Sequence, residues 1–464
     1  MTVWIRGVLL GMACGALLAA PALGADPAGG RASGAGVGTA VSRGAPEIVI
    51  YNDDRALVRQ PVSIDLPAGA TRVEMGGLPP RLDSTSVRLD AQGLRVLRQA
   101  YRFDVWDADL VFRRFLGDSI VYRYGGRRYR GALAGIDGDD LFILRADSAD
   151  VLTMMKRMQL TEVEFPRARR LRTTPTLEWE LDQAKAGSRA GFVSYVTAGL
   201  QWTAEYAAVL DKDERGLQLT GWAVIANRSG AAFRDAKVTL VAGEIHREGA
   251  LTDRGLAAEG APASTPAAAP ELFAYRSYPL ERALSLEDLE VAQVPIVGPA
   301  HITARRTYRY DGSRDGSKVR VQLELTNDKA SGLGAPLPEG RVRIYATGAG
   351  SAEALAGEDR IQHTAAGEKV RLLSGVAFDL VGERERVRHT RVSRNVTEDA
   401  YKVHLRNHGA RAAAVTVEET LYGNWEITQK SAEFRRPDAD TAEFDLNVPS
   451  GGEAEVTYTV RYTF

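Results

Sequence analysis

Cysteine is almost absent from this chain of 464 residues, which has a single one, Cys14. Cys14 lies inside an apolar stretch near the amino terminus, between Gly7 and Ala20. We expect this stretch to be removed as part of an export signal, which would leave the mature protein without a thiol. That expectation excludes disulfide bonds, thiolate metal sites and a cysteine nucleophile.

Long apolar runs and surplus charge are also missing. After the first stretch, no apolar run reaches the roughly 20 residues that a helix needs to cross a bilayer, so we predict no transmembrane span in the mature chain. The formal net charge is −1 at pH 7, and the interspersed charges do not predict capture of a nucleic acid. Most basic residues are arginine, which we attribute mainly to composition; a surface for carboxylates or phosphates is the alternative.

The amino terminus has the parts of a bacterial export signal. Arg6 gives a positive start, the apolar stretch follows, and small residues precede the expected cleavage point. We expect residues 1–25 to be removed, with cleavage near Ala25 or Asp26, and the mature protein to reside in the periplasm or cell envelope. The alternatives are an uncleaved anchor and a lipoprotein acylated at Cys14.

Composition divides the next part of the chain into three segments. Residues 26–45 are rich in Gly, Ala and Ser and predict a flexible tether, whereas residues 46–105 alternate apolar and polar side chains and predict an N-terminal β-sandwich part. Residues 106–168 contain short strands between glycine turns and predict a small β-barrel. Leu116-Gly117 and Gly131-Ala132-Leu133 give this segment a resemblance to Sm-like and SH3-like barrels. The Sm resemblance implies RNA binding, which export argues against, so a structural insert is favoured.

Strand patterns resume beyond the barrel. Residues 169–464 predict a further β-sandwich region, with a mobile loop at about 247–272 where Ala, Pro and Gly dominate. Asn227, Asn327 and Asn407 each follow an alternating strand and precede small or polar residues. We expect these asparagines in hairpin turns, where Asn tolerates positive φ and bonds its own backbone.

Helix signals are scarce. Residues 285–290 suggest one helical turn, with Ser285 as its cap and Asp288 at its third position. The whole pattern predicts an all-β protein of tandem antiparallel β-sandwiches with a small SH3/Sm-like barrel and very little helix.

Several separate segments between Ser194 and Phe464 carry a family resemblance. They include SYVTAGLQWTAEYAAVLD, LTGWAVIANRSGAAFRDAKVTLVAGEI, FAYRSYPLERALSLED, GLGAPLPEGRVRIY and YKVHLRNHGARAAAVTVEETLYGNWEI. In this order they resemble the bacterial domain of unknown function 4139, and residues 47–90 look like the N-terminal sandwich that often accompanies it. Mucoidy-inhibitor-type envelope proteins are similar in overall plan. The resemblance implies an exported, β-rich protein and supplies no activity, cofactor or catalytic residue.

Motifs for nucleophilic catalysis and metal binding are missing. The chain lacks a G-x-S-x-G elbow, and Ser194 lies in the middle of an expected strand. His404 and His408 are four residues apart, but a strand followed by a turn would not direct both at one metal. The segment from Asp311 imitates a calcium loop, yet Gln322 replaces the bidentate glutamate, so a hairpin turn is favoured. We predict no catalytic residue, no cofactor and no metal site.

One segment, GEDRIQHT, gathers chemistry-bearing side chains: Glu358, Asp359, Arg360 and His363. Carboxylates beside Arg and His could support acid-base chemistry, so these four residues form the candidate cluster. The favoured alternative is a charged turn that fixes a hairpin through local ion pairs.

The last ten residues alternate strictly between apolar and polar side chains. One face carries Val456, Tyr458, Val460, Tyr462 and Phe464. This resembles the terminal strand of outer-membrane barrels, but strands elsewhere are short and aromatic content is modest. We favour a last sandwich strand that buries its aromatic face.

These observations favour a non-enzymatic binding or scaffolding module of the bacterial envelope. Its expected partner is an envelope protein or a glycan, and not a nucleic acid. Two alternatives stay open: a periplasmic hydrolase or carbohydrate-active enzyme that uses carboxylates, and a β-protein inserted in the outer membrane. The oligomeric state is also left open.

Overall fold

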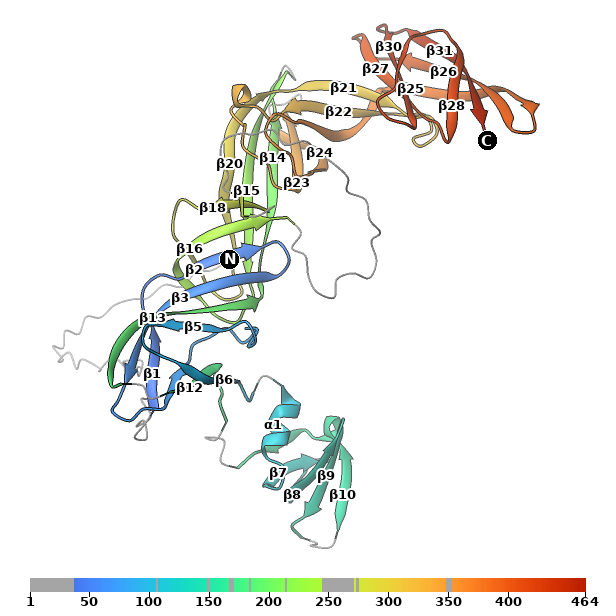
Figure 1. Cartoon of the computed structure of the whole chain (residues 1–464). Helices are drawn as coiled ribbons and strands as arrows, with labels where there is room; N and C mark the ends of the chain where they lie inside the picture. The colour runs from blue at the N-terminus through green and yellow to red at the C-terminus, as the bar shows by residue number, and fades with distance from the viewer. Residues whose placement is uncertain are drawn as a thin grey trace, which may run out of the picture.

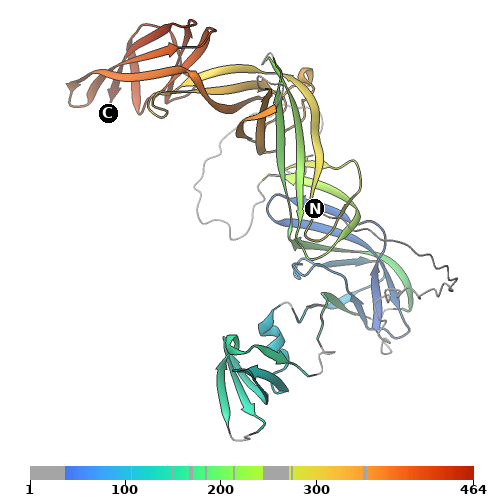
Figure 2. The same cartoon turned by 180° about the vertical axis from the view of Figure 1, so that it is seen from behind.

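Strands dominate the structure, a computed structural model, and confirm the all-β prediction. The structure describes residues 37–105, 107–147, 151–166, 171–182, 185–212, 215–243, 271–272, 275–347 and 353–464. Figures 1 and 2 show a bent, elongated molecule in which a first sheet, a middle sheet and a carboxy-terminal sandwich follow one another. The expected export signal, the first part of the tether and most of the loop at 247–272 lie outside the described residues.

The first sheet has 12 strands and is built from segments far apart in the sequence. Its main path runs β17-β18-β16-β2-β3-β1-β4-β12-β6. The strands are β1 (Val37–Ser42), β2 (Glu47–Tyr51), β3 (Arg55–Leu66), β4 (Arg72–Met75), β5 (Arg88–Ala91), β6 (Val96–Arg102), β12 (Thr176–Leu181), β13 (Gly187–Ala198), β16 (Phe233–Ala242), β17 (Glu271–Leu272), β18 (Tyr275–Pro279) and β19 (Leu284–Leu286).

Strand β1 corrects part of the tether prediction. Although its residues are small, β1 pairs antiparallel with β3 and parallel with β4. A Cβ atom on Gly38 would lie 2.6 Å from the carbonyl oxygen of Asp65, so only glycine allows this approach of the strands. Glycine here serves close packing, a role that composition alone does not distinguish from flexibility.

The first sheet also extends beyond the boundary expected at residue 105. β12 pairs with β4 and β6, and β13 pairs with β3 and β5, so residues assigned to the 169–464 region complete the first sheet. The small barrel is therefore inserted between β6 and β12, which are hydrogen-bonded neighbours. This arrangement agrees with the interpretation of the barrel as an insert.

The inserted unit is a five-stranded antiparallel sheet, ordered β10-β9-β8-β7-β11, around its own apolar core. Its elements are α1 (Ala108–Arg114), β7 (Ser119–Tyr124), β8 (Arg127–Asp137), β9 (Asp140–Arg145), β10 (Leu152–Lys156), the 3-10 turn η1 (Arg157–Gln159) and β11 (Glu162–Glu164). The helix was not predicted. Its signal is Asp107, whose side chain accepts a hydrogen bond from the Asp109 N–H at 2.9 Å and caps the first turn.

The middle sheet has five strands in the order β20-β15-β14-β23-β24. They are β14 (Leu200–Leu210), β15 (Gly216–Asn227), β20 (Val291–Thr303), β23 (Gly340–Thr347) and β24 (Glu353–Ile361). One continuous apolar core joins this sheet to the first, and Trp179 and Trp202 are buried in it. The two sheets therefore form one cooperative body rather than separate domains.

The carboxy-terminal sheet has nine strands and encloses a second core that contains Tyr310, Phe444 and Tyr458. Its elements are β21 (Arg305–Tyr310), β22 (Lys318–Thr326), the 3-10 turn η3 (Lys329–Ser331), β25 (Lys369–Ser393), β26 (Val396–Asn407), β27 (Ala413–Thr420), β28 (Asn424–Lys430), β29 (Phe434–Arg435), β30 (Thr441–Val448) and β31 (Glu453–Thr463). Figure 1 shows β21 and β22 extending from the middle sheet towards this sandwich.

Strand β31 largely follows its alternation pattern. Val456, Tyr458 and Val460 are buried in the second core, and Tyr462 packs against its edge. Phe464 departs from the pattern and is 80% exposed, because it lies past the last pair of the strand. The aromatic face is thus a buried sandwich face, apart from its final residue.

The sheets are interlocked by one recurring connection. Four antiparallel hairpins follow each other along the chain: β2–β3, β14–β15, β21–β22 and β25–β26. The strand after each of the last three hairpins pairs in parallel with the first strand of the hairpin before it: β16 with β2, β23 with β14, and β27 with β21. Each of the first three hairpins is therefore held by the strand that follows the next hairpin.

The predicted helical turn at 285–290 is wrong. Leu284–Leu286 form β19 against β16, and Leu289 has a φ of +63°, which a helix does not allow. Ser285 and Asp288 do accept backbone N–H groups, as caps would, but from Asp235 and Gly230 at 2.9 Å each. Among the described residues no helix is long and apolar enough to cross a membrane.

Candidate functional site

The candidate cluster lies on β24, the edge strand of the middle sheet, and in the turn after it. Alternation along the strand directs Glu358 and Arg360 to one face and Asp359 to the other. The Asp359 carboxylate accepts the Leu373 N–H at 2.5 Å, which ties β24 to β25. The four residues are adjacent in sequence, but they do not converge on one point.

Each remaining member of the cluster has a partner that fixes it. Glu358 accepts from Arg343 at 3.0 Å, and Arg360 donates to Glu339 at 2.5 Å. His363 accepts the Glu339 N–H on Nδ1 at 3.1 Å. These contacts agree with the alternative interpretation, a charged turn that fixes a hairpin.

The pairs around the cluster continue into a ladder of charges across β14, β23 and β24. Glu205 is held by Arg341 at 2.8 Å and by Arg343 at 2.9 Å. Partial burial of Glu205 opposes its ionisation, but hydrogen bonds and charge from the two arginines prevail and lower its pKa below the usual value. A carboxylate held in this way is a poor proton donor or acceptor at neutral pH.

A cavity of about 380 Å³ lies beside this ladder and is lined by Arg360 and His363, but not by Glu358 or Asp359. The carboxylates that do line it, Glu205 and Glu339, are bound to arginines. The geometry therefore keeps the predicted carboxylates out of the lining of this cavity.

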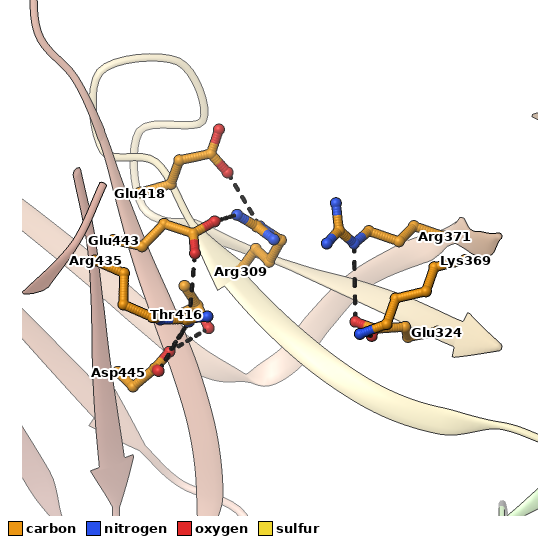
Figure 3. A network of polar contacts seen from close by, with 9 residues as sticks. All are labelled: Arg309, Glu324, Lys369, Arg371, Thr416, Glu418, Arg435, Glu443 and Asp445. Carbon is orange, nitrogen blue, oxygen red and sulfur yellow. Dashed lines mark hydrogen bonds and ion pairs between the residues drawn. The ribbon is translucent and has the colours of Figure 1, made fainter. Parts of the chain in front are cut away.

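A second polar network lies on the carboxy-terminal sandwich (Figure 3). Glu418 and Glu443 are direct cross-strand neighbours on β27 and β30, and Arg309 of β21 binds both of them. Arg435 then bridges Glu443 to Asp445 at 3.3 and 2.8 Å. Two carboxylates opposite each other repel, so the arginines are what makes this pairing stable.

A separate ion pair, between Arg384 and Glu419, is buried in the same sandwich. Glu419 is 1% exposed and accepts from Arg384 at 2.9 Å, while the Arg384 guanidinium lies 3.9 Å from the centre of the Tyr401 ring. Burial raises the pKa of the Glu419 carboxyl, against the opposing pull of the Arg384 charge. The carboxylate of this pair is thus buried in the sandwich, while the Arg384 side chain is 19% exposed.

The three asparagines do not form hairpin turns, and none has positive φ. Asn227 and Asn407 are the last residues of β15 and β26, and Asn327 directly follows β22. At each of these points the chain crosses to the next parallel strand, and each asparagine is buried. Asn407, for example, donates to the carbonyls of Arg411 and Val448 at 2.8 and 3.2 Å and accepts the Gly409 N–H at 2.9 Å. The prediction that these asparagine side chains form hydrogen bonds with their local backbone is confirmed.

Asn227 and Asn327 have the same environment as Asn407. Asn227 donates to Ala231 at 2.8 Å, and Asn327 donates to Ala335 at 2.8 Å. Both amides also reach carbonyls of a second, distant segment. The hydrogen bonds of these three side chains thus fix the crossings between the interlocked hairpins.

The other residues considered from the sequence have structural contacts. Asp311 accepts the Ser313 and Arg314 N–H groups at 2.9 and 3.2 Å, so it caps its own turn. His404 contacts Glu453 at 2.9 Å from within β26. Ser194 lies inside β13 as expected. Within the described part of the chain, no group of three or more His, Cys, Asp or Glu residues is placed to hold a metal ion.

A concavity that the sequence did not suggest lies where the middle sheet meets the carboxy-terminal sandwich. This cavity of about 960 Å³ is lined by the end of β20, by β21 and β25, and by the crossing after Asn407. Its charged lining consists of Arg215, Arg305, Arg306, Arg411 and Asp379. We call it the arginine cavity.

Aromatic side chains complete the arginine cavity. Phe378 lines it while 97% exposed, and Tyr308 lies beside Arg306, whose guanidinium is 5.5 Å from the ring centre. The crossing contributes small residues, Gly409 and Ala410 among them, that leave room for a ligand. The lining thus combines arginine guanidinium groups with apolar ring faces.

Sequence analysis missed this site for a physical reason. Arg215, Arg305 and Arg411 are separated by about a hundred residues each, and only the interlocked connections bring them together. The adjacent pair Arg305 and Arg306 is a local signal within the general abundance of arginine, which we attributed to composition. Arginine in an otherwise balanced chain gives no hint of where it gathers.

Comparison with known proteins adds no identity to this geometry. No family model matches the chain, and no curated protein matches it significantly. The resemblance to the domain of unknown function 4139 stays a prediction. The arginine cavity is therefore the feature on which a function can be argued.

Proposed function

We propose that this is an exported bacterial envelope protein that acts by binding and not by catalysis, and that the arginine cavity binds an acidic glycan. The observation that carries the proposal is the lining of the cavity, in which four arginines and two aromatic rings surround one carboxylate. Membership of the 4139-like family, with its exported relatives, is part of the same proposal.

The charges of the cavity favour a ligand with several carboxylates. Arginine presents a planar fork of donors that matches a carboxylate in two-point contact. Arg305 and Arg411 are both exposed and line the cavity, one at the start of β21 and one in the crossing before β27, the strand that pairs with β21. A chain of uronic acid units carries carboxylates at intervals and can contact both arginines together.

The aromatic residues favour a sugar rather than a small inorganic anion. Phe378 offers nearly its whole ring to solvent, which costs free energy unless a ligand covers it. Sugar rings have apolar faces that stack on such a side chain, and their hydroxyl groups keep the rest of the ligand hydrated. An exposed ring between arginines thus suits an acidic glycan.

The experiment is a binding titration with oligogalacturonate as the probe and a neutral dextran oligomer of equal length as its control. We expect oligogalacturonate to bind with an affinity that falls as salt rises, and dextran to bind far more weakly. The double variant R305A/R411A should weaken binding at least tenfold, at about 1.4 kcal/mol for each factor of ten. F378A should weaken it by a smaller factor.

The matched control is R98A, which removes an exposed arginine of the first sheet. It should leave the affinity unchanged. Equal binding by wild type and R305A/R411A would overturn the cavity assignment, and shortened oligogalacturonate after incubation would overturn the non-enzymatic part. Fractionation of cells that carry the full chain tests the envelope location, since a cytoplasmic pool alone contradicts export.

A further inference from the structure

The longest hairpin of the molecule ends in a surface with its own chemistry. β25 and β26 pair up to Ser393 and Val396, and the end of this hairpin projects at the edge of the carboxy-terminal sandwich that faces away from the middle sheet (Figures 1 and 2). We call residues 386–396 the hairpin tip. It is a different surface from the arginine cavity, which is lined by residues 377–380 in the middle of β25.

The hairpin tip carries four positive charges and no negative one. Arg386, Arg388, Arg391 and Arg394 are all exposed, and no Asp or Glu occurs between them. Within the described residues no carboxylate lies within ion-pair distance of any of these four arginines. The tip is therefore an unneutralised positive end of an otherwise balanced protein.

Two acidic residues near the tip are engaged elsewhere. Glu398 pairs with Arg461 at 2.7 Å, and Asp399 contacts His389 at 2.5 Å. Glu385 lies directly across from Lys402, whose own ion pair is with Glu455 at 2.6 Å. Acidic and basic side chains are thus mixed on the strands below the tip, whereas the tip itself has only basic ones.

Two β-bulges direct apolar side chains outward between these arginines. The pairing of β25 with β26 skips Val387, between Arg386 and Arg388, and skips Val392, between Arg391 and Ser393. A bulged residue leaves the regular alternation, so its side chain is re-aimed. Val387 is 59% exposed and Val392 53% exposed.

Phe464 extends this apolar surface. Its backbone N–H donates to the Asn395 carbonyl at 2.9 Å, so it lies against the turn of the hairpin, and it is 80% exposed. Val387, Val392 and Phe464 among four arginines make the end of this projecting hairpin amphipathic. A projecting amphipathic end can press into a layered surface.

We infer that the hairpin tip docks the protein on an anionic lipid surface, with the bulged valines entering the headgroup region and the arginines contacting lipid phosphates. Basic residues near an anionic membrane gain free energy from its negative surface potential, and apolar side chains gain it by leaving water. Neither term alone holds a protein firmly, so the two must act together.

The test is co-sedimentation of the full chain with vesicles of equal parts phosphatidylglycerol and phosphatidylcholine, compared with phosphatidylcholine alone. We expect binding to the anionic vesicles only. R386Q/R388Q should weaken it about 25-fold, since each basic residue near such a surface contributes about 1 kcal/mol. V387S/V392S should weaken it several-fold without changing the charge.

The matched controls are R98Q on the first sheet and V376S, an exposed valine (54%) on the same strand as the tip. Both should bind as wild type does. Unchanged binding by R386Q/R388Q would overturn the assignment. A loss of vesicle binding in the V376S control as large as the loss in V387S/V392S would overturn it too. Loss in R386Q/R388Q with no loss in V387S/V392S would also overturn it, because a purely ionic contact needs no bulges.

A second readout does not depend on loss of binding. V387W places an indole at the first bulge, and its emission should shift to shorter wavelength when anionic vesicles are added, beyond any shift of the wild type. The absence of this extra shift at saturating vesicles would contradict insertion. Inorganic phosphate should compete poorly, whereas full competition by millimolar phosphate would assign the tip to a free anion instead.

Discussion

The molecule uses the same residue types in two very different ways, and burial is what separates them. On the middle sheet, Glu205 pairs with Arg341 and Arg343, and Arg343 also pairs with Glu358, in a ladder that water reaches. In the carboxy-terminal sandwich, Glu419 and Arg384 pair beneath the surface, where Glu419 is 1% exposed. The ladder adds little to stability and is screened by salt, whereas the buried pair becomes costly once one partner is lost.

The sharpest way to test this comparison is R384M, which leaves Glu419 buried without its partner. We expect a loss of about 3–5 kcal/mol in the free energy of unfolding, because an uncompensated buried charge must be accommodated. Urea unfolding measures the loss, and amide hydrogen exchange should locate it in β26, β27 and β31. The double variant R384M/E419Q should recover part of the loss.

The free energy of unfolding of R384M should depend on pH, and the pKa of Glu419 gives the direction of that dependence. Burial raises the pKa of Glu419, and removing Arg384 takes away the pull that opposes this rise. The folded variant then binds a proton at pH values where the unfolded chain does not, so its stability increases as pH falls through the folded pKa. A deficit that is equal at neutral and acidic pH would show that the pair does not behave as a buried one.

Asn407 tests whether a buried neutral group matters as much as a buried charge. N407A removes two donated bonds and one accepted bond and leaves backbone groups unpaired inside the sandwich. We expect a loss of about 1–3 kcal/mol in the free energy of unfolding. N424A, at an exposed position on β28, is the control and should change stability little. Equal effects of the two variants would show that Asn407 does not fix the crossing between β26 and β27.

Glu205 tests the exposed side of the comparison. The Arg341 and Arg343 contacts lower its pKa despite partial burial, so its contribution is present at neutral pH and is lost as pH falls through the folded pKa. E205Q should cost about 0.5–1 kcal/mol at neutral pH and low salt, and less at acidic pH or high salt. Thermal unfolding at several pH values measures this. A cost that grows on acidification would reverse the sign and contradict the assignment.

Glu358 should show the smallest effect. It has one exposed partner, Arg343, which keeps its contact with Glu205 when Glu358 is changed. We expect E358Q to change the free energy of unfolding by no more than about 0.5 kcal/mol. A large loss in urea unfolding would mean that the candidate cluster does more than fix a hairpin.

The sequence predicted what depends on local pattern. The alternation in β31 identified the buried face of Val456, Tyr458 and Val460, and the strand content of the whole chain followed from the same rule. β1 was missed because its small residues pack through contacts with β3 and β4, which local composition does not reveal. The order along the chain was thus predictable, and the pairing between distant strands was not.

The candidate site shows the same limit more clearly. Glu358 and Asp359 are neighbours in sequence, yet alternation in β24 directs them to opposite faces. Arg305 and Arg411 are far apart in sequence, yet they line one cavity because β27 pairs in parallel with β21. Proximity along a strand is therefore a weak guide to a site, and the crossings decide which side chains meet.

The interlocked hairpins also determine how the molecule responds to mechanical tension. If the body is pulled apart, the parallel ladders of β16 with β2, β23 with β14 and β27 with β21 must break before the hairpins can separate. The inserted five-stranded unit enters and leaves through the adjacent strands β6 and β12, so these ladders hold the hairpins together without it. Resistance to mechanical tension thus depends on the parallel ladders and not on the inserted unit.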